Sequence, residues 1–528
     1  MHVDMQSLMV DKDNVTVPRI RAARKRGDLL LHLAFFVAVF SLAPLLVLGG
    51  LTIGLSFLVA GVAAVVATFC LVRWPGLGLF VLAICATLVE QEALKPAPPF
   101  TNYLFVFYWP ASLQGLPERP IGFFILFAFF ALLCQRLATR QGLLKGGALF
   151  LPFCGYMLCV AWGVIHGLTS GGNLKVVVLE VRPFWYFFIS YMMAYNLVSQ
   201  KKHVQNLFWV IIICAGIKAL QGTYIYLIVL HGDLTGHHEI MAHEESFFFI
   251  AVLLLVVLFC IHYRARAQLY VALAILPFLL IALLGNQRRA DYLALLIGIV
   301  IAWVLTFITK PKMRKSLLIG MIICSVLGGG YVAAFYKSPG TFAQPARALV
   351  SVFQPDVNSS DYQSNLYREI ENYDLRYTIS RNPLGAGFGK QFEQPIPLPN
   401  IQDLDPYYLF IPHNTIYWIW MRLGPIGYLA FWFLIGGAIV RGCLIARSLR
   451  DPYLRLVAIF IVAVTVMEII LAYADYQLYF YRNVIYLGIL FGVLVKLPAL
   501  EEKKEQSQNE VADGVRLPAS SLVGSGRA

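Results

Sequence analysis

Long apolar segments follow one another along almost the whole chain, and they limit the folds that it can adopt. Of the 528 residues, 59% are hydrophobic and only 13% are charged, which is more apolar surface than a soluble domain buries. A helix needs about 20 apolar residues to cross a bilayer, and most of the segments reach that length. The sequence therefore predicts an all-α, polytopic membrane protein.

Hydropathy predicts about 14 spans, and we expect 12–14 transmembrane helices with one large extracytoplasmic loop. The predicted spans cover residues 28–48, 51–72, 76–92, 121–137, 147–167, 177–198, 206–230, 246–263, 268–286, 292–309, 316–336, 414–440, 453–473 and 479–497. The corresponding regions are a basic tail (1–27), an N-terminal bundle (28–336), the large loop (337–412), C-terminal helices (413–500) and a disordered tail (501–528).

The distribution of basic residues predicts the orientation of these spans. Lysine and arginine gather in alternate short loops, which marks the cytoplasmic face and places both termini inside. The net charge of +13 follows from this bias, so it does not indicate nucleic-acid binding. No small-residue cleavage site follows the basic start, and the first span is expected to be an uncleaved anchor. The loop 337–412 then lies outside the cytoplasm.

Cysteines and histidines give little indication of a metal site. The nine cysteines lie in or beside apolar segments and are read as small core residues. A polar stretch, residues 231–245, contains His237, His238 and His243, but the five-residue step between the last two does not place both on one helical face. A metal site and an exposed loop at a substrate entrance remain the two readings. We expect no cofactor.

Arg288 and Arg289 are unusual because they begin a span on the outer side of the membrane. Arginine is costly in lipid unless it has an anionic partner, and its planar guanidinium binds phosphate oxygens in pairs. Adjacent helical residues point about 100° apart, so only one is expected to face the interior. The two readings are a clamp on a diphosphate and snorkelling to lipid headgroups. Glu180 and Arg182, at another outer span end, either pair with each other or line a lipid path.

The large loop contains a helical stretch from Tyr367 to Ser380, which includes Arg368 and Arg376. It ends near Arg381 and Pro383, and Gly385, Gly387 and Gly389 follow at alternate positions. Alternating glycines allow a backbone to approach a phosphate closely, but they also form tight structural turns. No lysine or hydroxyl residue completes a nucleotide motif, so both readings stay open.

His413 closes the loop where it meets the bilayer, and Asn414 follows it. An imidazole there is either structural or a general base. The segment from Asn414 to Val440 is too long for one straight span, so we expect a bend at Gly424 and Pro425.

Together these motifs resemble the O-antigen ligase/polymerase family. The resemblance rests on Arg289 at a span start, the stretch from Arg368 to Gly389, and His413-Asn414 followed at eleven positions by Gly424, and it covers about residues 285–430. Members are multi-pass glycosyltransferases that use undecaprenyl-diphosphate-linked glycans. Two positions depart from the family pattern: Arg422 stands where an acidic residue is common, and Arg288 where serine is common.

The resemblance implies roles for the outer residues. His413 and Arg289 would be catalytic, with His413 orienting or deprotonating an acceptor hydroxyl and Arg289 neutralising the leaving diphosphate. The substrate-binding residues would be Arg288, Arg368, Arg376, Arg381, Asn414, Gly385 and Gly387. The transfer would invert the anomeric carbon and need no metal or nucleotide.

Three classes of function remain, and the third of them is a membrane scaffold that carries out no chemistry. The first is a ligase-type glycosyltransferase in a bacterial inner membrane, which moves a glycan to lipid A-core, to a growing polysaccharide or to a protein. The second is a polysaccharide transporter or lipid-linked-glycan flippase, for which we would expect charged residues near mid-span and helices broken at the bilayer centre.

Overall fold

The computed structural model describes residues 66, 69–90, 106, 118–139, 144–235, 239–262, 267–338, 340–351, 360–400 and 406–514. The predicted span 28–48, most of 51–72, and the residues His237 and His238 lie outside this described part. The chain divides into two compact units, residues 1–82 with 122–145 and residues 83–121 with 146–528. In the first unit the structure describes the beginning of α3 (Pro75–Leu88) and most of α4 (Pro120–Ala138).

The second unit contains the helices that form the candidate site. Its elements are α5 (Phe150–Thr169), α6 (Leu174–Leu197), α7 (Lys201–Tyr224) with the π-helix η3 (Ile225–Val229), α8 (His243–His262), α9 (Ala267–Gly285), α10 (Arg289–Thr309), η4 (Pro311–Met313), α11 (Arg314–Phe335), η5 (Thr341–Ala343), α12 (Gln344–Ser351), α13 (Ser360–Arg381), α14 (Thr415–Ser448), α15 (Pro452–Ala474), η6 (Gln477–Tyr479) and α16 (Tyr481–Gly514).

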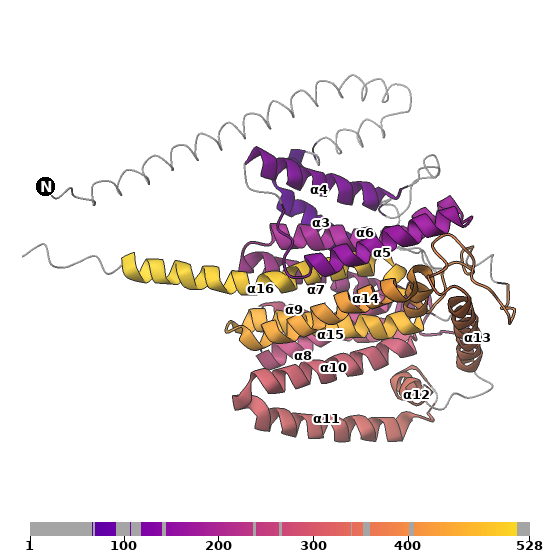
Figure 1. Cartoon of the computed structure of the whole chain (residues 1–528). Coiled ribbons are helices and arrows are strands. Elements are labelled where there is room, and N and C mark those ends of the chain that lie inside the picture. The colour runs from indigo at the N-terminus through magenta and orange to yellow at the C-terminus, as the bar shows by residue number, and fades with distance from the viewer. Residues whose placement is uncertain are drawn as a thin grey trace, which may run out of the picture. The chain divides into compact units, whose positions relative to one another are not determined.

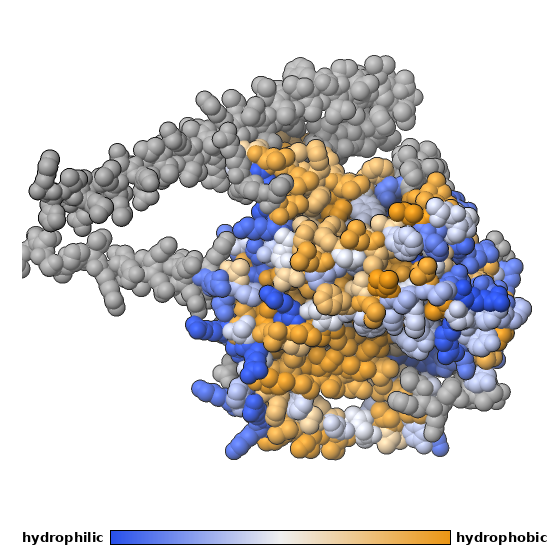
Figure 2. Space-filling model, viewed as in Figure 1, coloured by the Kyte–Doolittle hydropathy of each residue, from blue (hydrophilic) through white to orange (hydrophobic). Residues whose placement is uncertain are grey.

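Eleven helices of the described part are long and apolar enough to cross a membrane. They correspond to the eleven predicted spans from 121–137 onward, and the predicted span 76–92 appears as the shorter apolar helix α3. Figure 2 shows a broad apolar surface along the middle of the helices, with hydrophilic surface toward both ends of the spans. The chain is therefore a multi-pass, all-α membrane protein, as the hydropathy predicts.

Close packing of α16 against α6 forms part of the core. Gly488 and Gly492, one helical turn apart, face α6, and a Cβ on Gly488 would lie only 2.5 Å from the carbonyl oxygen of Phe187. Small residues at this spacing let two helix backbones approach in a membrane. α8, α15 and α16 are buried along most of their apolar length.

Five buried charged side chains join α3, α7, α8 and α16 near one end of the spans. The Arg482 guanidinium donates from Nε to the carbonyl oxygen of Ala86 (2.8 Å), pairs with Glu245, and lies 3.3 Å from an oxygen of Glu244. Lys218 pairs with Glu90 and lies 3.6 Å from Glu245. Opposite charges thus offset the cost of burial, and the arginine also binds carbonyls at the end of α3.

Replacing Arg482 by glutamine is expected to destabilise the fold by about 3–5 kcal/mol, because Glu244 and Glu245 would stay buried without their main cation. Thermal unfolding in detergent checks this, with Arg381→Gln as the control. Arg381 forms an exposed ion pair with Glu393, whose loss should cost less than about 1 kcal/mol. Equal stability of the two variants would contradict the prediction.

The large loop folds into two helices, α12 and α13, before it returns to the spans. α13 lies crosswise to α14 and α15 at the end of the bundle from which residues 337–412 emerge (Figure 1), and we call this the loop end. The predicted helical stretch from Tyr367 to Ser380 is confirmed and extends over Ser360–Arg381.

α14 contains the predicted bend. Gly424 adopts φ 66° and ψ −173°, which interrupts the helix one residue before Pro425. The predicted long segment with an interruption at Gly424 is therefore confirmed. At the other end of the chain, α16 continues through Leu500 to Gly514, so the tail predicted to be disordered from residue 501 begins as helix.

Candidate active site

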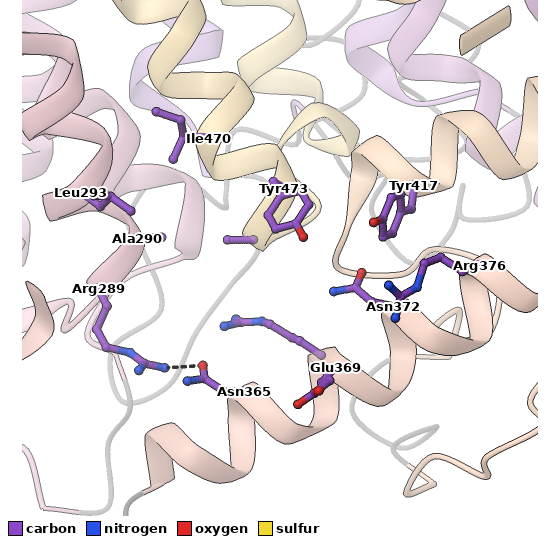
Figure 3. Close-up of a pocket in the computed structure, with 12 residues that line it drawn as sticks. Arg289, Ala290, Leu293, Asn365, Glu369, Asn372, Arg376, Tyr417, Ile470 and Tyr473 are labelled. Carbon is purple, nitrogen blue, oxygen red and sulfur yellow. Dashed lines mark hydrogen bonds between the residues drawn. The ribbon is translucent and has the colours of Figure 1, made fainter. Parts of the chain in front are cut away.

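A cavity of about 600 Å³ opens at the loop end between α10, α13, α14 and α15. Figure 3 shows Asn365, Glu369, Asn372 and Arg376 along α13 on one side of it, with Arg289, Tyr417 and Tyr473 contributed by the three spans. The complete lining is Arg289, Ala290, Leu293, Asn365, Arg368, Glu369, Asn372, Arg376, Tyr417, Ile470, Tyr473 and Ala474. One wall is polar and comes from the loop helix, and the other is largely apolar and comes from the spans.

Helical spacing explains the polar wall. Asn365, Arg368, Asn372 and Arg376 are three or four residues apart, so α13 presents them on one face. The helix packs against α14, which holds this face toward the spans. The sequence predicts the helix and its arginines but not Asn365 and Asn372, and their spacing from Arg368 is the signal that identifies them.

Two arginines from different elements meet in the cavity. Arg289, at the start of α10, donates from Nη2 to the side-chain oxygen of Asn365 (3.1 Å) and from Nη1 to Ser351 (3.4 Å). Among the residues that the structure describes, the Arg368 guanidinium makes no hydrogen bond or ion pair. Burial lowers the pKa of Arg368, Asp475 opposes this, and Arg288 and Arg289 lower it further. A negatively charged ligand bound here would favour the charged form of Arg368, because it would offset both the burial and the repulsion from the neighbouring arginines.

The remaining loop arginines lie in different surroundings. Arg376 is exposed and borders the cavity, one turn of α13 beyond Asn372. Arg381 ends the helix with 61% of its side chain exposed, pairs with Glu393 at 3.5 Å and does not line the cavity. The structure thus brings Arg289, Arg368 and Arg376 together and leaves Arg381 apart.

His413 lies beside α13 and is held there by Glu371. The imidazole Nδ1 is 3.1 Å from one carboxylate oxygen of Glu371, and the His413 backbone N–H donates to the other (3.0 Å). Tyr367 and Tyr476 contact the ring edge-on, with centroids 5.5 and 5.6 Å away. With Nδ1–H donating to the carboxylate, the neutral ring carries its lone pair on Nε2, the atom suited to accept a proton.

Asn414 has a structural role that explains its position. Its side-chain oxygen accepts from the Tyr417 backbone N–H (3.1 Å), which caps the first turn of α14. Its Nδ2 donates to the side-chain oxygen of Asn372 (2.8 Å), a residue of the cavity wall. Asn414 therefore connects α14 to α13 and reaches the cavity only through Asn372.

Arg288 forms ion pairs with carboxylates and does not line the cavity. It pairs with Asp475 and lies 3.8 Å from Glu239 and 3.6 Å from Asp291. Burial lowers the pKa of Arg288, but these three acids outweigh it and raise the pKa above its usual value. For Asp475, burial raises the pKa, and Arg288 and His243 more than compensate, so it lies well below its usual range. Arg288 therefore neither extends toward lipid headgroups nor contacts the cavity.

The alternating glycines form a turn packed against the spans. Gly385 (φ 91°) and Gly387 (φ 75°) adopt the left-handed region, and a Cβ on Gly387 would lie 2.4 Å from the Gly167 nitrogen. The Gly387 N–H donates to the carbonyl of Arg422 (3.2 Å), and the Gly385 N–H to that of Asn382 (2.8 Å). These amides are engaged by the protein, which supports the structural-turn reading of this segment.

Two further predictions need correction. Glu180 and Arg182 do not pair with each other: Glu180 pairs with Arg422 at 2.6 Å, and Arg182 with Glu118 at 3.2 Å. The polar stretch 231–245 is not an exposed loop throughout, because Glu244 and Glu245 belong to the first turn of α8 and are fully buried. In the described part of the chain, no three His, Cys, Asp or Glu side chains lie close enough to hold a metal ion.

The comparison with protein families bears directly on this site. Residues 272–432 match the family model of O-Antigen ligase. The matched segment contains Arg289, Arg368, His413 and the break at Gly424, so the resemblance to the O-antigen ligase/polymerase family is confirmed. No curated protein matches the chain with significance. The family supports a membrane protein of polysaccharide biosynthesis with a ligase- or polymerase-type function.

Proposed function

We propose that the protein transfers a glycan from undecaprenyl diphosphate to an acceptor hydroxyl at the loop end. The observation that supports this most directly is the Arg368 guanidinium, which makes no hydrogen bond or ion pair in the described part of the chain and shares its cavity with Arg289. A site that holds two guanidinium groups close together is suited to an anion with several oxygens, such as a diphosphate. The acceptor is lipid A-core or a growing polysaccharide.

The lining of the cavity fits a donor that is both charged and lipid-soluble. Leu293, Ile470 and Ala474 form an apolar wall on α10 and α15, opposite the polar face of α13. A polyprenyl chain leaving the diphosphate would follow the apolar wall, and sugar hydroxyls would meet the asparagines and Glu369 on α13. Tyr417 and Tyr473 offer both an aromatic face and a hydroxyl, a combination that suits the boundary between lipid and water.

The proposed reaction is a single displacement. The acceptor oxygen attacks the anomeric carbon, the bond from that carbon to the phosphate oxygen breaks, and its electron pair leaves with the lipid diphosphate. Arg289 and Arg368 stabilise the charge that develops there. His413 Nε2 takes the hydroxyl proton, and Glu371 stabilises the resulting imidazolium through Nδ1.

Metal removal provides a first test. Purified protein should transfer the glycan at an unchanged rate in EDTA, because arginines perform the charge neutralisation that a metal ion would otherwise supply. Product formation from a lipid-diphosphate donor is measured by gel shift or mass spectrometry, with and without chelator. Loss of transfer in EDTA, restored by a divalent ion, would contradict the metal-independent mechanism.

Orientation provides an independent test. We propose that the protein lies in a bacterial inner membrane with both termini in the cytoplasm, which places the cavity outside. In a cysteine-free background, Leu384→Cys in the exposed turn should react with an impermeant maleimide added to spheroplasts, whereas Arg447→Cys should react only after lysis. Labelling in the opposite order would reject the proposed mechanism.

Some features also match the alternative, a flippase or transporter. Lys218, Arg422 and Glu468 are buried within predicted spans, and Gly424 interrupts one of them. In the described part of the chain, however, each of these charged groups has a protein partner: Glu90, Glu180 and Asn483, respectively. A flippase would move the donor between leaflets without consuming it, so the transfer assay separates the two functions.

A further inference from the structure

The Glu180–Arg422 pair is a fully buried contact between α6 and the loop end of α14. Glu180 is 0% exposed on α6 and Arg422 is 1% exposed on α14, with 2.6 Å between the carboxylate Oε1 and the guanidinium Nη2. Removing two charges from water and lipid headgroups is costly, and pairing only partly compensates. Because the ion pair alone does not explain why both charges are buried, the other hydrogen bonds of Glu180 and Arg422 indicate the role of the pair.

Arg422 connects two chain segments that are far apart in the loop. Its Nη1 donates to the carbonyl oxygen of Gly387 (3.0 Å), in the turn that follows α13. Its Nη2 donates to the carbonyl oxygen of Phe410 (2.7 Å), three residues before His413. One planar guanidinium thus holds both the glycine turn that follows α13 and the approach to His413.

Glu180 completes the same connection from the side of α6. Its Oε2 accepts from the Gly389 backbone N–H (2.5 Å), two residues after the carbonyl that Arg422 binds. Its Oε1 accepts from the Trp418 indole N–H (3.2 Å), in the first half of α14. The two side chains together fix the glycine turn, the approach to His413 and α14 in one arrangement.

We infer that Glu180 and Arg422 are positioning residues, which set the distance between His413 and the arginines of α13. The inference rests on the proposed function for the identity of the reacting groups. Neither residue lines the cavity, so neither would contact the donor. Their effect would be geometric: a displacement of about 1 Å between a base and a bound substrate can lower a rate about 100-fold.

Arg422→Lys is the most informative variant because it separates charge from geometry. Lysine keeps the positive charge beside Glu180 but has no planar fork that reaches both the Gly387 and Phe410 carbonyls. We expect kcat to fall about 10- to 100-fold, with the KM for the donor unchanged within about threefold, because the cavity arginines remain. The thermal midpoint in detergent should fall by no more than that of Arg482→Lys, because both substitutions exchange a buried, paired guanidinium for an ammonium.

Arg482→Lys is the matched control. Arg482 is an equally buried arginine paired with glutamates, but it binds the end of α3 and does not touch the loop. This variant is expected to lose stability while its folded fraction keeps the wild-type kcat. If the kcat of the folded Arg422→Lys protein equals that of the wild type, so that activity is lost only along with folded protein as in Arg482→Lys, the positioning role is wrong.

Hydrogen exchange tests the inference independently of any activity. The amides of residues 387–389 and 410–413 should exchange faster in Arg422→Lys than in the wild type, and those of α15 should not change. Unchanged exchange in both segments would overturn the inference. If exchange changes as expected while the wild-type protein transfers no glycan from the lipid-diphosphate donor, the proposed function fails and the connection made by Arg422 stands.

Discussion

Replacing His413 by alanine is expected to lower kcat about 100- to 10,000-fold, the usual contribution of a positioned general base. The donor KM should change little, because His413 lies beside the cavity and is not among its lining residues. Transfer of a lipid-diphosphate-linked glycan under single-turnover conditions measures the effect on the chemical step. A folded His413→Ala protein that transfers at the wild-type rate would reject a catalytic role for this residue.

Glu371→Gln provides the partner variant for this experiment. The amide has one acceptor oxygen, so if it accepts from the His413 backbone N–H its NH2 faces Nδ1 and moves the ring proton to Nε2, and it cannot stabilise an imidazolium by charge. We therefore expect a smaller loss than for His413→Ala, and little further loss when the two substitutions are combined, since they affect one unit. Additive losses would indicate that the two residues act separately.

Replacing Arg368 by alanine is the second change with a large expected effect, a fall in kcat/KM of about 100- to 1,000-fold. The substitution removes a guanidinium that makes no hydrogen bond or ion pair in the described part of the chain, so the loss would come from donor contacts and not from a broken ion pair. Arg368→Lys should recover only part of the rate, because an ammonium cannot bind two phosphate oxygens in a planar fork. Inorganic pyrophosphate should inhibit the wild type competitively and Arg368→Ala more weakly.

Arg381→Ala is the control on the same helix. Arg381 has a similar charge and lies thirteen positions further along, but its side chain is mostly exposed and pairs with Glu393. The rate of this variant should stay within about twofold of the wild type, since an exposed ion pair of this kind contributes little. If Arg368→Ala and Arg381→Ala lose activity equally, a general effect of loop charge explains the results better than a clamp.

The spans could be predicted because lipid imposes a length and an apolar composition on each one. The bend in α14 was also predictable, since Gly424 and Pro425 lie inside a segment too long for one straight helix. The buried charges were harder to anticipate. Lys218 and Arg482 are separated by hundreds of residues. Glu245, which both of them contact, belongs by sequence to a polar stretch expected to be exposed, but it lies in α8 and is buried in the core.

The site was predictable in its residue types and only partly in its contacts. Helical periodicity places Arg368 and Arg376 on one face, and the span start identifies Arg289. No local pattern indicates that Glu371 holds His413, because the two residues are 42 positions apart and meet only through tertiary packing. Asp475 is further still from Arg288, which it removes from the cavity.

Gly385 of the loop and Gly424 of α14 pack directly against each other, and this contact limits the chain length that fits between His413 and Gly424. A Cβ on Gly424 would lie 2.6 Å from the carbonyl carbon of Leu384, and one on Gly385 would lie 2.6 Å from the Gly424 nitrogen. Because this contact fixes Gly424, the first turns of α14 determine where His413 lies relative to Glu371. One residue inserted into that stretch would rotate His413 by about 100° about the helix axis. The number of residues between His413 and Gly424 thus fixes the direction of the imidazole, and insertions or deletions in related sequences should fall outside this interval.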